Sequence, residues 1–425
     1  MKISQLHDHF LDCNKVSTDT RKIEPNDMFF ALKGDNFNGN KFAKQALDNG
    51  AKFVIIDEED YKSSKNTILV DDVLKTLQDL ATYHRNYLNI RIIALTGSNG
   101  KTTTKELIHA TLSQKYNTTA TLGNLNNHIG VPLTILSMDN DTEIGIVEMG
   151  ANHLNEIAFL CNIAQPDYGY ITNFGKAHLE GFGSIEGVIK GKSELYDYLV
   201  ENNKQVFLNA DDAIQYKKLS TYVKKFGYSE DKTDFYNIKL IEANPFVKFK
   251  VEDLLISTNL IGAYNFTNLC AATIIGKYFG VELEAIKKGL ESYTPENNRS
   301  QIINKNSNEI ILDAYNANPS SMTAALHNFF NLKKENKVAI LGDMFELGNE
   351  SEIEHQTIAN LALELDFNTT YLVGENFFKT ETNSEKLKRF KSFDNFKTHF
   401  SVPKNATVLI KGSRGMALER TLELL

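Results

Sequence analysis

A glycine-rich turn between an apolar run and a helical pattern constrains this chain more than any other segment. The run Ile92-Ile93-Ala94-Leu95 leads into Thr96-Gly97-Ser98-Asn99-Gly100-Lys101-Thr102-Thr103-Thr104, and a helical pattern begins near Lys101. In this order a buried strand ends at the turn, where backbone N–H groups and the helix N-terminus together attract an anion. The segment therefore predicts an α/β sheet with a phosphate-binding loop at the end of one strand.

The residue types in this loop suit a nucleotide with Mg²⁺. Lys101 would hold the β- and γ-phosphates, and Thr102 would bind Mg²⁺ through its hydroxyl group. Leu95 stands where the common G-x-x-x-x-G-K-[ST] pattern has its first glycine, so the loop is a variant of that pattern. A glycine turn before an ordinary helix is the alternative interpretation. The residues expected at the nucleotide are Gly97, Ser98, Asn99, Gly100, Lys101, Thr102 and Thr103.

The chain of 425 residues needs more than one hydrophobic core, because domains usually hold roughly 100 to 200 residues each. Strand and helix patterns alternate along it, which predicts the α/β class. We expect a small α/β domain at residues 1–88 and a central domain with a parallel sheet of the phosphate-loop ATPase type at residues 89–297. A doubly wound, Rossmann-like domain is expected at residues 298–425.

The boundaries rest on local patterns. Expected strands are 28–32, 53–56 and 67–70 in the first unit, 92–95 and segments ending at Glu148 and Asn173 in the second, and 310–312, 338–341, 371–373 and 408–410 in the third. Expected helices are 41–49, 72–86, one that starts near Lys101, and 185–199.

Composition limits the partners and the compartment. A net charge of -8 without a long basic run argues against nucleic acid and favours small molecules. No apolar run approaches the roughly 20 residues of a membrane span, and the first residues lack the apolar segment of a secretion signal. We therefore expect a cytoplasmic protein, acting as a monomer. Cys13, Cys161 and Cys270 are odd in number and far apart, which predicts reduced thiols in the core.

Two residues beyond the loop are candidate metal ligands. Glu148 ends the strand pattern Ile144-Gly145-Ile146-Val147, and an acid at the carboxyl end of a strand beside a phosphate loop is well placed to hold a cation. A plain strand-end carboxylate is the alternative. His178 follows another strand in a loop, where a histidine is more often structural than a ligand.

Lys192 is out of place in its helical pattern. It lies in the apolar stripe formed by Ile185, Val188, Leu195 and Leu199. A buried, unpaired ammonium group must find anions, become neutral or be chemically modified. Reaction with CO₂ would give a carbamate whose negative charge could bind Mg²⁺. The alternative is a lysine that reaches solvent from the edge of the stripe.

These segments, in this order, resemble the Mur ligases, the family that builds the peptide of the bacterial cell-wall precursor. The resemblance covers nearly the whole chain and is strongest to the members that add D-alanyl-D-alanine. Besides the phosphate loop, the segments that carry it are STDTR at 17–21, PNDMFFAL at 25–32, TLGNLNNHIGVP at 121–132, DAYNANP at 313–319, LGDMFELG at 341–348 and KGSRG at 411–415.

The resemblance implies a role for each matching residue. Lys101, Glu148, His178 and Lys192 would be the catalytic set. The metal ligands would be Thr102, Glu148, His178 and Lys192 as its carbamate. Asn265, Arg299 and Asp313 would join the loop at ATP, although Tyr264 stands where many relatives have histidine. Ser17, Thr20 and Arg21 would hold the UDP-sugar in the first domain. Other substrate contacts would come from Asn124, Asn126, Asn127, Asn316, Asn318, Ser413 and Arg414.

The Asp313–Pro319 segment also has a purely structural interpretation. Asn318 would cap a helix that begins with Pro319. Both interpretations can hold together.

The activity implied is an ATP-dependent ligation of D-alanyl-D-alanine to UDP-N-acetylmuramoyl-tripeptide through an acyl phosphate. A sister ligase that adds one amino acid is the nearest alternative; the YNAN segment at 315–318 and the lack of an Asp-Asn-Pro-Arg motif argue against it. A phosphate-loop switch or ATP-binding regulatory module would keep Lys101 and Thr102 but need neither His178 nor Lys192. Whether the third peptide residue is lysine or diaminopimelate stays open.

Overall fold

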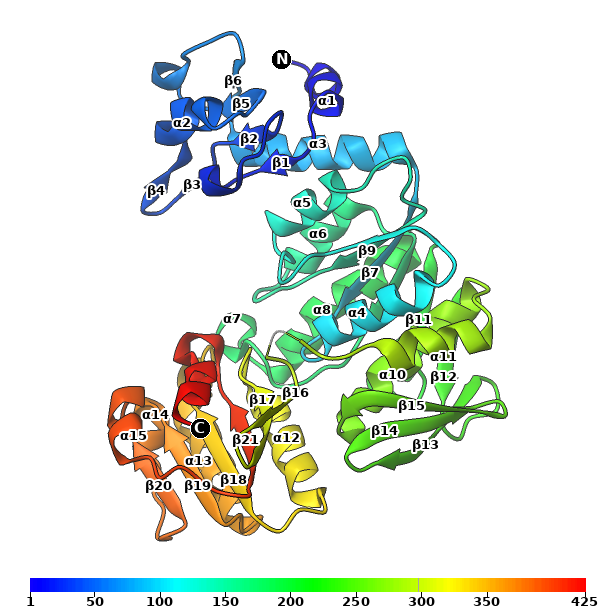
Figure 1. Ribbon diagram of the computed structural model, residues 1–425. Helices are drawn as coiled ribbons and strands as arrows, with labels where there is room; N and C mark the ends of the chain where they lie inside the picture. The colour runs from blue at the N-terminus through cyan, green and yellow to red at the C-terminus, as the bar shows by residue number, and fades with distance from the viewer. Residues whose placement is uncertain (297) are drawn as a thin grey trace.

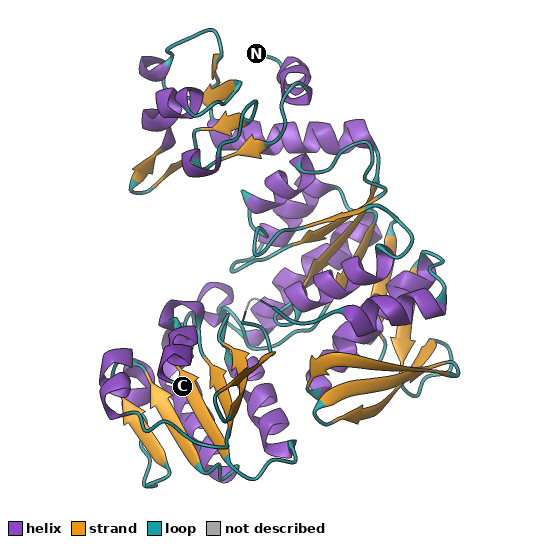
Figure 2. Ribbon diagram, viewed as in Figure 1, coloured by secondary structure: helices purple, strands orange, loops and turns teal. Residues whose placement is uncertain are grey.

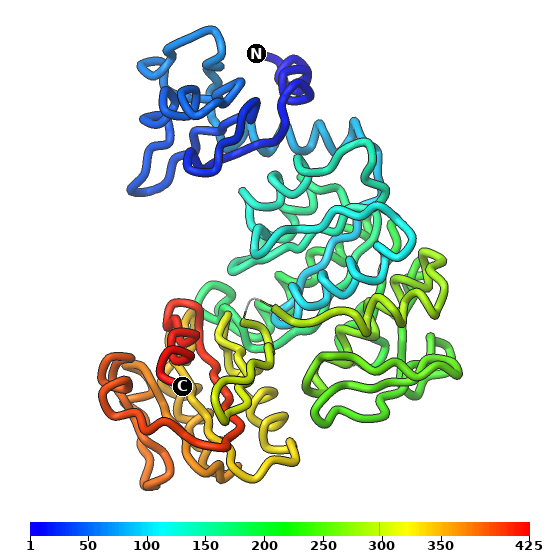
Figure 3. Tube along the Cα trace, viewed as in Figure 1, coloured from blue at the N-terminus to red at the C-terminus, as the bar shows by residue number. Residues whose placement is uncertain are grey.

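The computed structural model describes residues 1–296 and 298–425, and sheets of four, nine and six strands follow one another along these residues (Figure 1). The three-part α/β architecture is therefore confirmed. The predicted boundary at residue 297 lies outside the described residues. Figure 3 shows the central unit between the N-terminal and C-terminal units, which lie at opposite ends of the molecule.

The N-terminal unit is a small parallel sheet in the order β1-β2-β5-β6. The predicted strand at 53–56 is confirmed, and those at 28–32 and 67–70 end earlier than expected. Its elements are α1 (Ile3–Leu11), β1 (Val16–Ser17), β2 (Met28–Phe30), β3 (Lys33–Gly34), β4 (Phe37–Asn38), α2 (Ala43–Asp48), β5 (Phe53–Ile56), β6 (Thr67–Leu69) and α3 (Val73–Leu88).

The central unit contains a nine-stranded sheet in the order β15-β14-β13-β12-β11-β10-β7-β9-β8. Its elements are β7 (Arg91–Thr96), α4 (Lys101–Leu112), β8 (Thr118–Ala120), α5 (Gly130–Leu136), β9 (Ile144–Glu148), α6 (Glu156–Ala164), β10 (Tyr168–Ile171), α7 (Leu179–Phe182), α8 (Ile185–Glu201), β11 (Gln205–Asn209), α9 (Ala213–Lys218), β12 (Lys225–Ser229), β13 (Tyr236–Ala243), β14 (Phe246–Val251), β15 (Leu254–Ile261), α10 (Phe266–Tyr278) and α11 (Leu283–Ser292).

The parallel sheet predicted for this unit is present from β8 to β13. Strands β13, β14 and β15 extend it in antiparallel fashion, which the sequence analysis did not predict. Figure 2 shows this extension as a strand-rich region beside the helix-covered part of the sheet.

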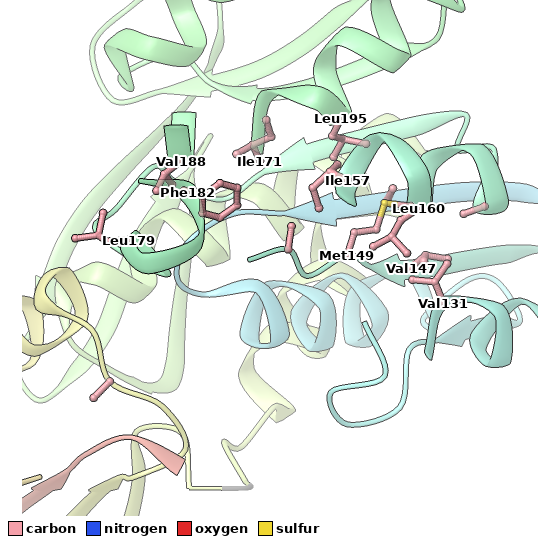
Figure 4. Packing of buried hydrophobic residues seen from close by; sticks show 14 of the residues in the cluster. Val131, Val147, Met149, Ile157, Leu160, Ile171, Leu179, Phe182, Val188 and Leu195 are labelled. Carbon is pink, nitrogen blue, oxygen red and sulfur yellow. The ribbon is translucent and has the colours of Figure 1, made fainter. Parts of the chain in front are cut away.

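Alternating side chains of β7 explain why helices cover both faces of the central sheet. Ile92 and Ala94 belong to one buried cluster and Ile93 and Leu95 to another, because successive side chains of a strand point to opposite faces. Figure 4 shows the first cluster, in which residues of α5, α6 and α8 pack against β9 and β10. Its labelled members are Val131, Val147, Met149, Ile157, Leu160, Ile171, Leu179, Phe182, Val188 and Leu195.

The C-terminal unit has a six-stranded sheet in the order β16-β17-β21-β18-β19-β20, parallel except for the β16–β17 pair. All four strands predicted here are present. Its elements are β16 (Gln301–Lys305), β17 (Asn308–Asp313), α12 (Pro319–Asn331), β18 (Lys337–Gly342), α13 (Ser351–Glu364), β19 (Thr369–Val373), α14 (Glu375–Phe378), β20 (Leu387–Phe390), α15 (Phe393–His399) and β21 (Thr407–Lys411).

The cysteines are free thiols in the described residues. Cys161 and Cys270 are fully buried, as predicted, but Cys13 is only partly buried, so its assignment to the core was wrong. The cause is its position just after α1, where the chain leaves the N-terminal helix at the surface. Within residues 1–296 and 298–425, none of the helices is long and apolar enough to cross a membrane.

Helix α3 joins the first two units through a buried arginine. Arg85 donates hydrogen bonds to the carbonyl oxygens of Ala164 (3.2 Å) and Gln165 (3.2 Å), and its guanidinium lies 2.8 Å from the Asp167 carboxylate. These partners belong to the end of α6 and the turn before β10. Burial lowers the pKa of Arg85, and Asp167 opposes that shift by favouring the charged form.

Replacement of Arg85 by methionine should destabilise this junction. The variant keeps an apolar stem but leaves two carbonyl groups without their donor, so we expect a loss of about 2 to 3 kcal/mol in the free energy of unfolding. Calorimetric thermal unfolding measures the difference. Lys75→Met, on the exposed face of the same helix, should stay within about 0.5 kcal/mol of wild type, and equal losses in both variants would contradict the role of Arg85.

Candidate active site

A cavity of about 890 Å³ lies between the central and C-terminal units, at the carboxyl ends of β7 and β9. Ligands of open α/β sheets bind at this edge. The predicted site residues that line it are Ser98, Asn99, Gly100, Lys101, Thr102, Thr103, Asn124, Asn126, Asn127, Glu148, His178, Asn265, Arg299, Asp313, Asn316, Asn318, Ser413 and Arg414. Segments that are far apart in the sequence thus meet at one cavity.

The phosphate loop needs its two glycines for steric reasons. Gly97 has φ +144° and approaches Thr172 so closely that a Cβ atom there would lie 2.0 Å from the threonine Oγ1. Gly100 has φ +77°, and its Cβ would lie 2.6 Å from the side-chain oxygen of Asn268. Gly97 therefore shapes the loop from behind and does not itself line the cavity.

Asn268 is a site residue that the sequence analysis missed. Its Oδ1 accepts a hydrogen bond from Thr104 Oγ1 (3.0 Å), and its Nδ2 donates to Asn265 Oδ1 (2.9 Å). It thereby ties the first turn of α4 to the start of α10, directly after the predicted Asn265. Its position three residues after Asn265, one helical turn away, was the signal that could have revealed it.

Lys101 lies over its own loop. Its Nζ donates to the carbonyl oxygens of Gly97 (2.7 Å) and Ser98 (3.2 Å). Burial lowers its pKa, while the nearby carboxylate of Glu148 acts in the opposite direction. The hydrogen bonds of the ammonium group are thus to loop carbonyl oxygens, and an anionic ligand there would add negative charge beside it.

Glu148 offers one free oxygen to the cavity. Its side chain is 1% exposed, Oε1 accepts from Asn126 Nδ2 at 2.7 Å, and Oε2 is buried without a hydrogen-bond partner among the described residues. A buried carboxylate oxygen without a donor is costly unless a cation binds it. The plain strand-end alternative leaves this atom unexplained, so the local structure fits the predicted Mg²⁺.

His178 meets the C-terminal unit. The residue has φ +53° at the start of α7, and its Nδ1 lies 2.5 Å from Oε2 of Glu346. This contact to His178 lowers the pKa of Glu346. The backbone N–H of Glu180 also donates to the carbonyl oxygen of Glu346 (3.2 Å). Glu346 was not predicted as a site residue, although it stood within the segment at 341–348 that carries the resemblance.

Lys192 is fully buried, which excludes the solvent-reaching alternative. Its Nζ donates to the carbonyl oxygen of Ala151 (2.8 Å) and lies 5.0 Å from the centre of the Phe182 ring. Burial first, and then the charge of Lys101, hold the pKa of Lys192 well below its usual range. It does not line the cavity itself; it lies behind Ala151, which does.

Asn318, on the C-terminal wall of the cavity, links the two units. Asn318 caps α12 by accepting from the Ser321 N–H (2.9 Å), with Pro319 at the first helical position, so the structural interpretation of this segment is confirmed. The same side chain donates to Asn99 Oδ1 across the cavity (2.8 Å). Asn318 therefore caps α12 and, with the same side chain, holds the phosphate loop against the C-terminal unit.

The rest of this wall carries charge. Lys411, 2% exposed on its side chain, lies 2.6 Å from the carboxylate of Asp313 and donates to the Asn316 carbonyl oxygen (3.2 Å). Arg299 lies over the ring of Tyr315, 3.8 Å from its centre. Lys411 and Tyr315 line the cavity but were not predicted, although both stood within segments that the analysis had singled out.

Besides Gly97 and Lys192, three predicted residues do not line this cavity. Ser17, Thr20 and Arg21 lie in the N-terminal unit, where Arg21 forms a bidentate pair with Asp19 (2.9 and 2.8 Å). They stay predictions for a separate substrate contact. Among the described residues, no group of three or more His, Cys, Asp and Glu side chains is arranged to hold a metal ion, so the predicted set depends on Thr102 and a modified Lys192 as well.

The close approach at Gly100 predicts a cost beyond backbone strain. Gly183 has nearly the same φ, +76°, but a Cβ atom there would meet nothing within 4 Å. We expect Gly183→Ala to cost about 1 kcal/mol in stability through its left-handed φ alone. Gly100→Ala should cost about 1 to 3 kcal/mol more, because Asn268 must also move. Thermal unfolding of the two variants measures this difference, and equal losses would contradict the crowded loop.

Three protein-family descriptions match the chain, one after another along its length. "Mur ligase family, catalytic domain" matches residues 13–85, "Mur ligase middle domain" matches 95–276, and "Mur ligase, glutamate ligase domain" matches 298–414. The three matches fall in the three sheet-containing units described above.

Similar proteins match this chain over almost its full length and theirs. A UDP-N-acetylmuramoyl-tripeptide--D-alanyl-D-alanine ligase of Bacillus subtilis (strain 168) is 35% identical, covering 96% of this chain and 92% of the relative. The protein of the same name from Escherichia coli (strain K12) is 34% identical, covering 96% and 93%.

Solved structures agree with the sequence relatives. MurF from Acinetobacter baumannii superposes with a TM-score of 0.85 at 30% identity, covering 100% of this chain and 98% of that one. MurF ligase from Thermotoga maritima, in complex with ADP, has a TM-score of 0.80 at 28% identity, covering 98% and 97%. Full-length similarity above 30% identity, together with the shared three-unit fold, shows that the chain belongs to the Mur ligase family.

Proposed function

We propose that the protein joins D-alanyl-D-alanine to UDP-N-acetylmuramoyl-tripeptide at the expense of ATP, which makes the pentapeptide precursor of peptidoglycan. The observation that carries this proposal is the single cavity shared by a phosphate loop, the free oxygen of Glu148 and the loops of the C-terminal unit. Relatives named for this activity match along almost the whole chain.

The reaction needs two steps at one place. The γ-phosphoryl group of ATP passes to the terminal carboxylate of the tripeptide, which releases ADP and forms an acyl phosphate. The amine of D-alanyl-D-alanine then attacks the acyl carbon, so that the C–N bond forms, phosphate leaves and the amine loses a proton. The protein contributes mainly charge stabilisation and alignment, and alignment can supply roughly 7 to 11 kcal/mol of the barrier reduction.

The phosphate loop and its neighbours would act on the first step. Backbone N–H groups of the loop and the N-terminus of α4 would face the phosphates, and Lys101 would turn from its loop carbonyls to the β- and γ-phosphates. Asn265 and Arg299 would contact the nucleotide, with Asp313 at the ribose. Each of these side chains lines the cavity.

The metal would be held beside the loop. Thr102, Glu148 and His178 line the cavity, and Oε2 of Glu148 is the buried oxygen that needs a cation. Bound Mg²⁺ would neutralise phosphate charge during the transfer. Lys192, as a carbamate, would place a negative charge behind Ala151; its lowered pKa supports this, because only an uncharged amine reacts with CO₂.

The C-terminal unit would present the amine. Asn316, Asn318, Ser413 and Arg414 lie on its side of the cavity, opposite the phosphate loop. Asn318 already contacts Asn99 of that loop, and His178 contacts Glu346. Domain closure of this kind brings the dipeptide amine to an acyl phosphate and keeps water away from it.

Phosphate release provides the first test. Purified protein with ATP, Mg²⁺ and UDP-N-acetylmuramoyl-tripeptide should release phosphate with D-alanyl-D-alanine and not with single amino acids. Lys101→Ala should lower kcat by about 10²-fold or more, because it removes a charge aimed at the transferred group. The matched control is Lys190→Ala, an exposed lysine on α8, which should retain wild-type rates.

The outcomes separate the alternatives. Turnover with a single amino acid would assign the protein to a sister ligase. ATP binding without turnover for any acceptor would favour a regulatory module. Use of tripeptides that end in lysine or in diaminopimelate would identify the third residue of the natural substrate.

The carbamate can be detected directly. Protein equilibrated with ¹³C-labelled bicarbonate should show a carbamate carbon signal by NMR at neutral and alkaline pH, because the depressed pKa of Lys192 leaves its amine uncharged. Lys192→Met should lose the signal and Lys190→Met should keep it. A wild-type protein without the signal that is fully active in CO₂-free buffer would exclude the modification.

A further inference from the structure

The loop that follows β18 forms part of the cavity wall without being a helix or strand. It runs from Asp343 to Leu347, and its residues Phe345 and Glu346 line the cavity. Glu346 has φ +61° and carries the carboxylate that meets His178. A loop with this backbone conformation keeps its shape only if its N–H groups are held from outside.

His355, in the first turns of α13, holds one of these groups. The side chain is 0% exposed, and its Nε2 accepts the N–H of Met344 at 3.0 Å. Its Nδ1 lies 2.6 Å from the carbonyl oxygen of Ser351. A carbonyl oxygen can only accept, so Nδ1 carries the hydrogen and Nε2 offers its lone pair. The two contacts therefore require a neutral imidazole in one tautomer.

The neighbouring N–H groups are held by other partners. Phe345 N–H donates to Ser413 Oγ (3.0 Å), and the N–H of Ser413 donates to the carbonyl oxygen of Asp343 (3.2 Å). The carboxylate of Asp343 accepts from the N–H groups of Asn376 and Phe377, both at 2.9 Å, at the start of α14. Of the loop's N–H groups, that of Met344 is held by an imidazole nitrogen and that of Phe345 by a hydroxyl group.

We propose that His355 is a positioning residue for the ligation step: its neutral Nε2 fixes the Met344 amide, and through it places Glu346 against His178 when the C-terminal unit is closed. The role rests on the proposed function. Met344 and Glu346 are two residues apart, so rotation of the Met344 peptide would move the Glu346 carboxylate away from the central unit.

Charge around His355 sets how this contact responds to pH. The carboxylate of Asp343 lies 3.7 Å from Nε2, and Glu354 is adjacent in the helix, paired with Lys176 at 2.6 Å. The ring of Phe377 packs edge-on against the imidazole (4.7 Å between ring centres) and carries no charge. Burial nevertheless lowers the pKa of His355 below its ordinary value, so the neutral form prevails at neutral pH.

The sign of the pH effect follows from this lowered pKa. His355 binds a proton less tightly in the folded protein than in the unfolded chain. Its contribution to the free energy of unfolding is therefore complete above the unfolded pKa of about 6.5 and declines as the pH falls below that value. Protonation of His355 would also place a hydrogen on Nε2, so that this N–H group would face the N–H of Met344 with no acceptor between them. Activity supported by His355 should therefore fall on the acidic side.

Three variants at this position separate its hydrogen bonds. His355→Gln can place an amide oxygen near the position of Nε2 and still accept from Met344. His355→Asn can replace only the Nδ1 contact to Ser351, and His355→Leu replaces neither. The matched control is His399→Leu, an exposed histidine of α15 in the same unit.

We expect the Asn and Leu variants to lower kcat/KM for D-alanyl-D-alanine by about tenfold or more, with KM for the nucleotide-linked tripeptide unchanged. The kcat/KM of the Gln variant should stay within about threefold of wild type. The acidic decline in its pH–rate profile should lie at lower pH than in wild type, because glutamine does not titrate. Circular dichroism at the assay temperature verifies folding; should the Leu variant unfold, the comparison of Gln with Asn decides.

Each contrary result has one meaning. Wild-type protein that turns over the dipeptide, with Asn and Leu variants that match it, would overturn the role of His355 alone. A Gln variant as impaired as folded Asn and Leu variants would also overturn it, because the acceptor would not matter. Wild-type protein without dipeptide turnover would overturn the proposed function and this role together.

Discussion

The close contact between the ends of β7 and β10 is the constraint on which the cavity depends. Thr172 Oγ1 donates to the carbonyl oxygen of Asn99 (2.6 Å), and the N–H of Asn99 donates to Asn173 Oδ1 (3.0 Å). Only glycine at position 97 lets the two segments approach so closely. The phosphate loop is thus shaped by a second loop, residues 172–178, and not by its own residues alone.

That second loop also reaches the C-terminal unit. Its Gly175 carbonyl oxygen accepts from Ser98 Oγ (2.8 Å), and the N–H of Lys176 donates to Ser320 Oγ (2.9 Å). His178, at its end, meets Glu346. One short segment therefore connects the phosphate side of the cavity with the side from which the amine would come. The position of the C-terminal unit and the shape of the phosphate loop are physically coupled.

Much of this arrangement was predictable where the signal was local. The strand at Phe53–Ile56, the helix from Lys101 and the apolar stripe around Lys192 could all be inferred from short patterns, because burial repeats with the period of the element. Strand β13 could not, since Tyr236–Ala243 is mostly half-buried or exposed and lacks a clear alternation. Glu346 was missed because its partner His178 is distant in the sequence.

The contacts between the two units are suited to repeated opening. The Lys176–Glu354 and His178–Glu346 pairs each have one partner whose side chain is about half exposed, at 53% and 50%. Polar contacts of this exposure contribute at most about 1 kcal/mol each, because water and salt screen them. Polar interfaces of this kind let domains move, so closure would depend on contacts that bound substrates add. A stronger, apolar interface would hold the product inside, whereas a ligase must release three products after every cycle.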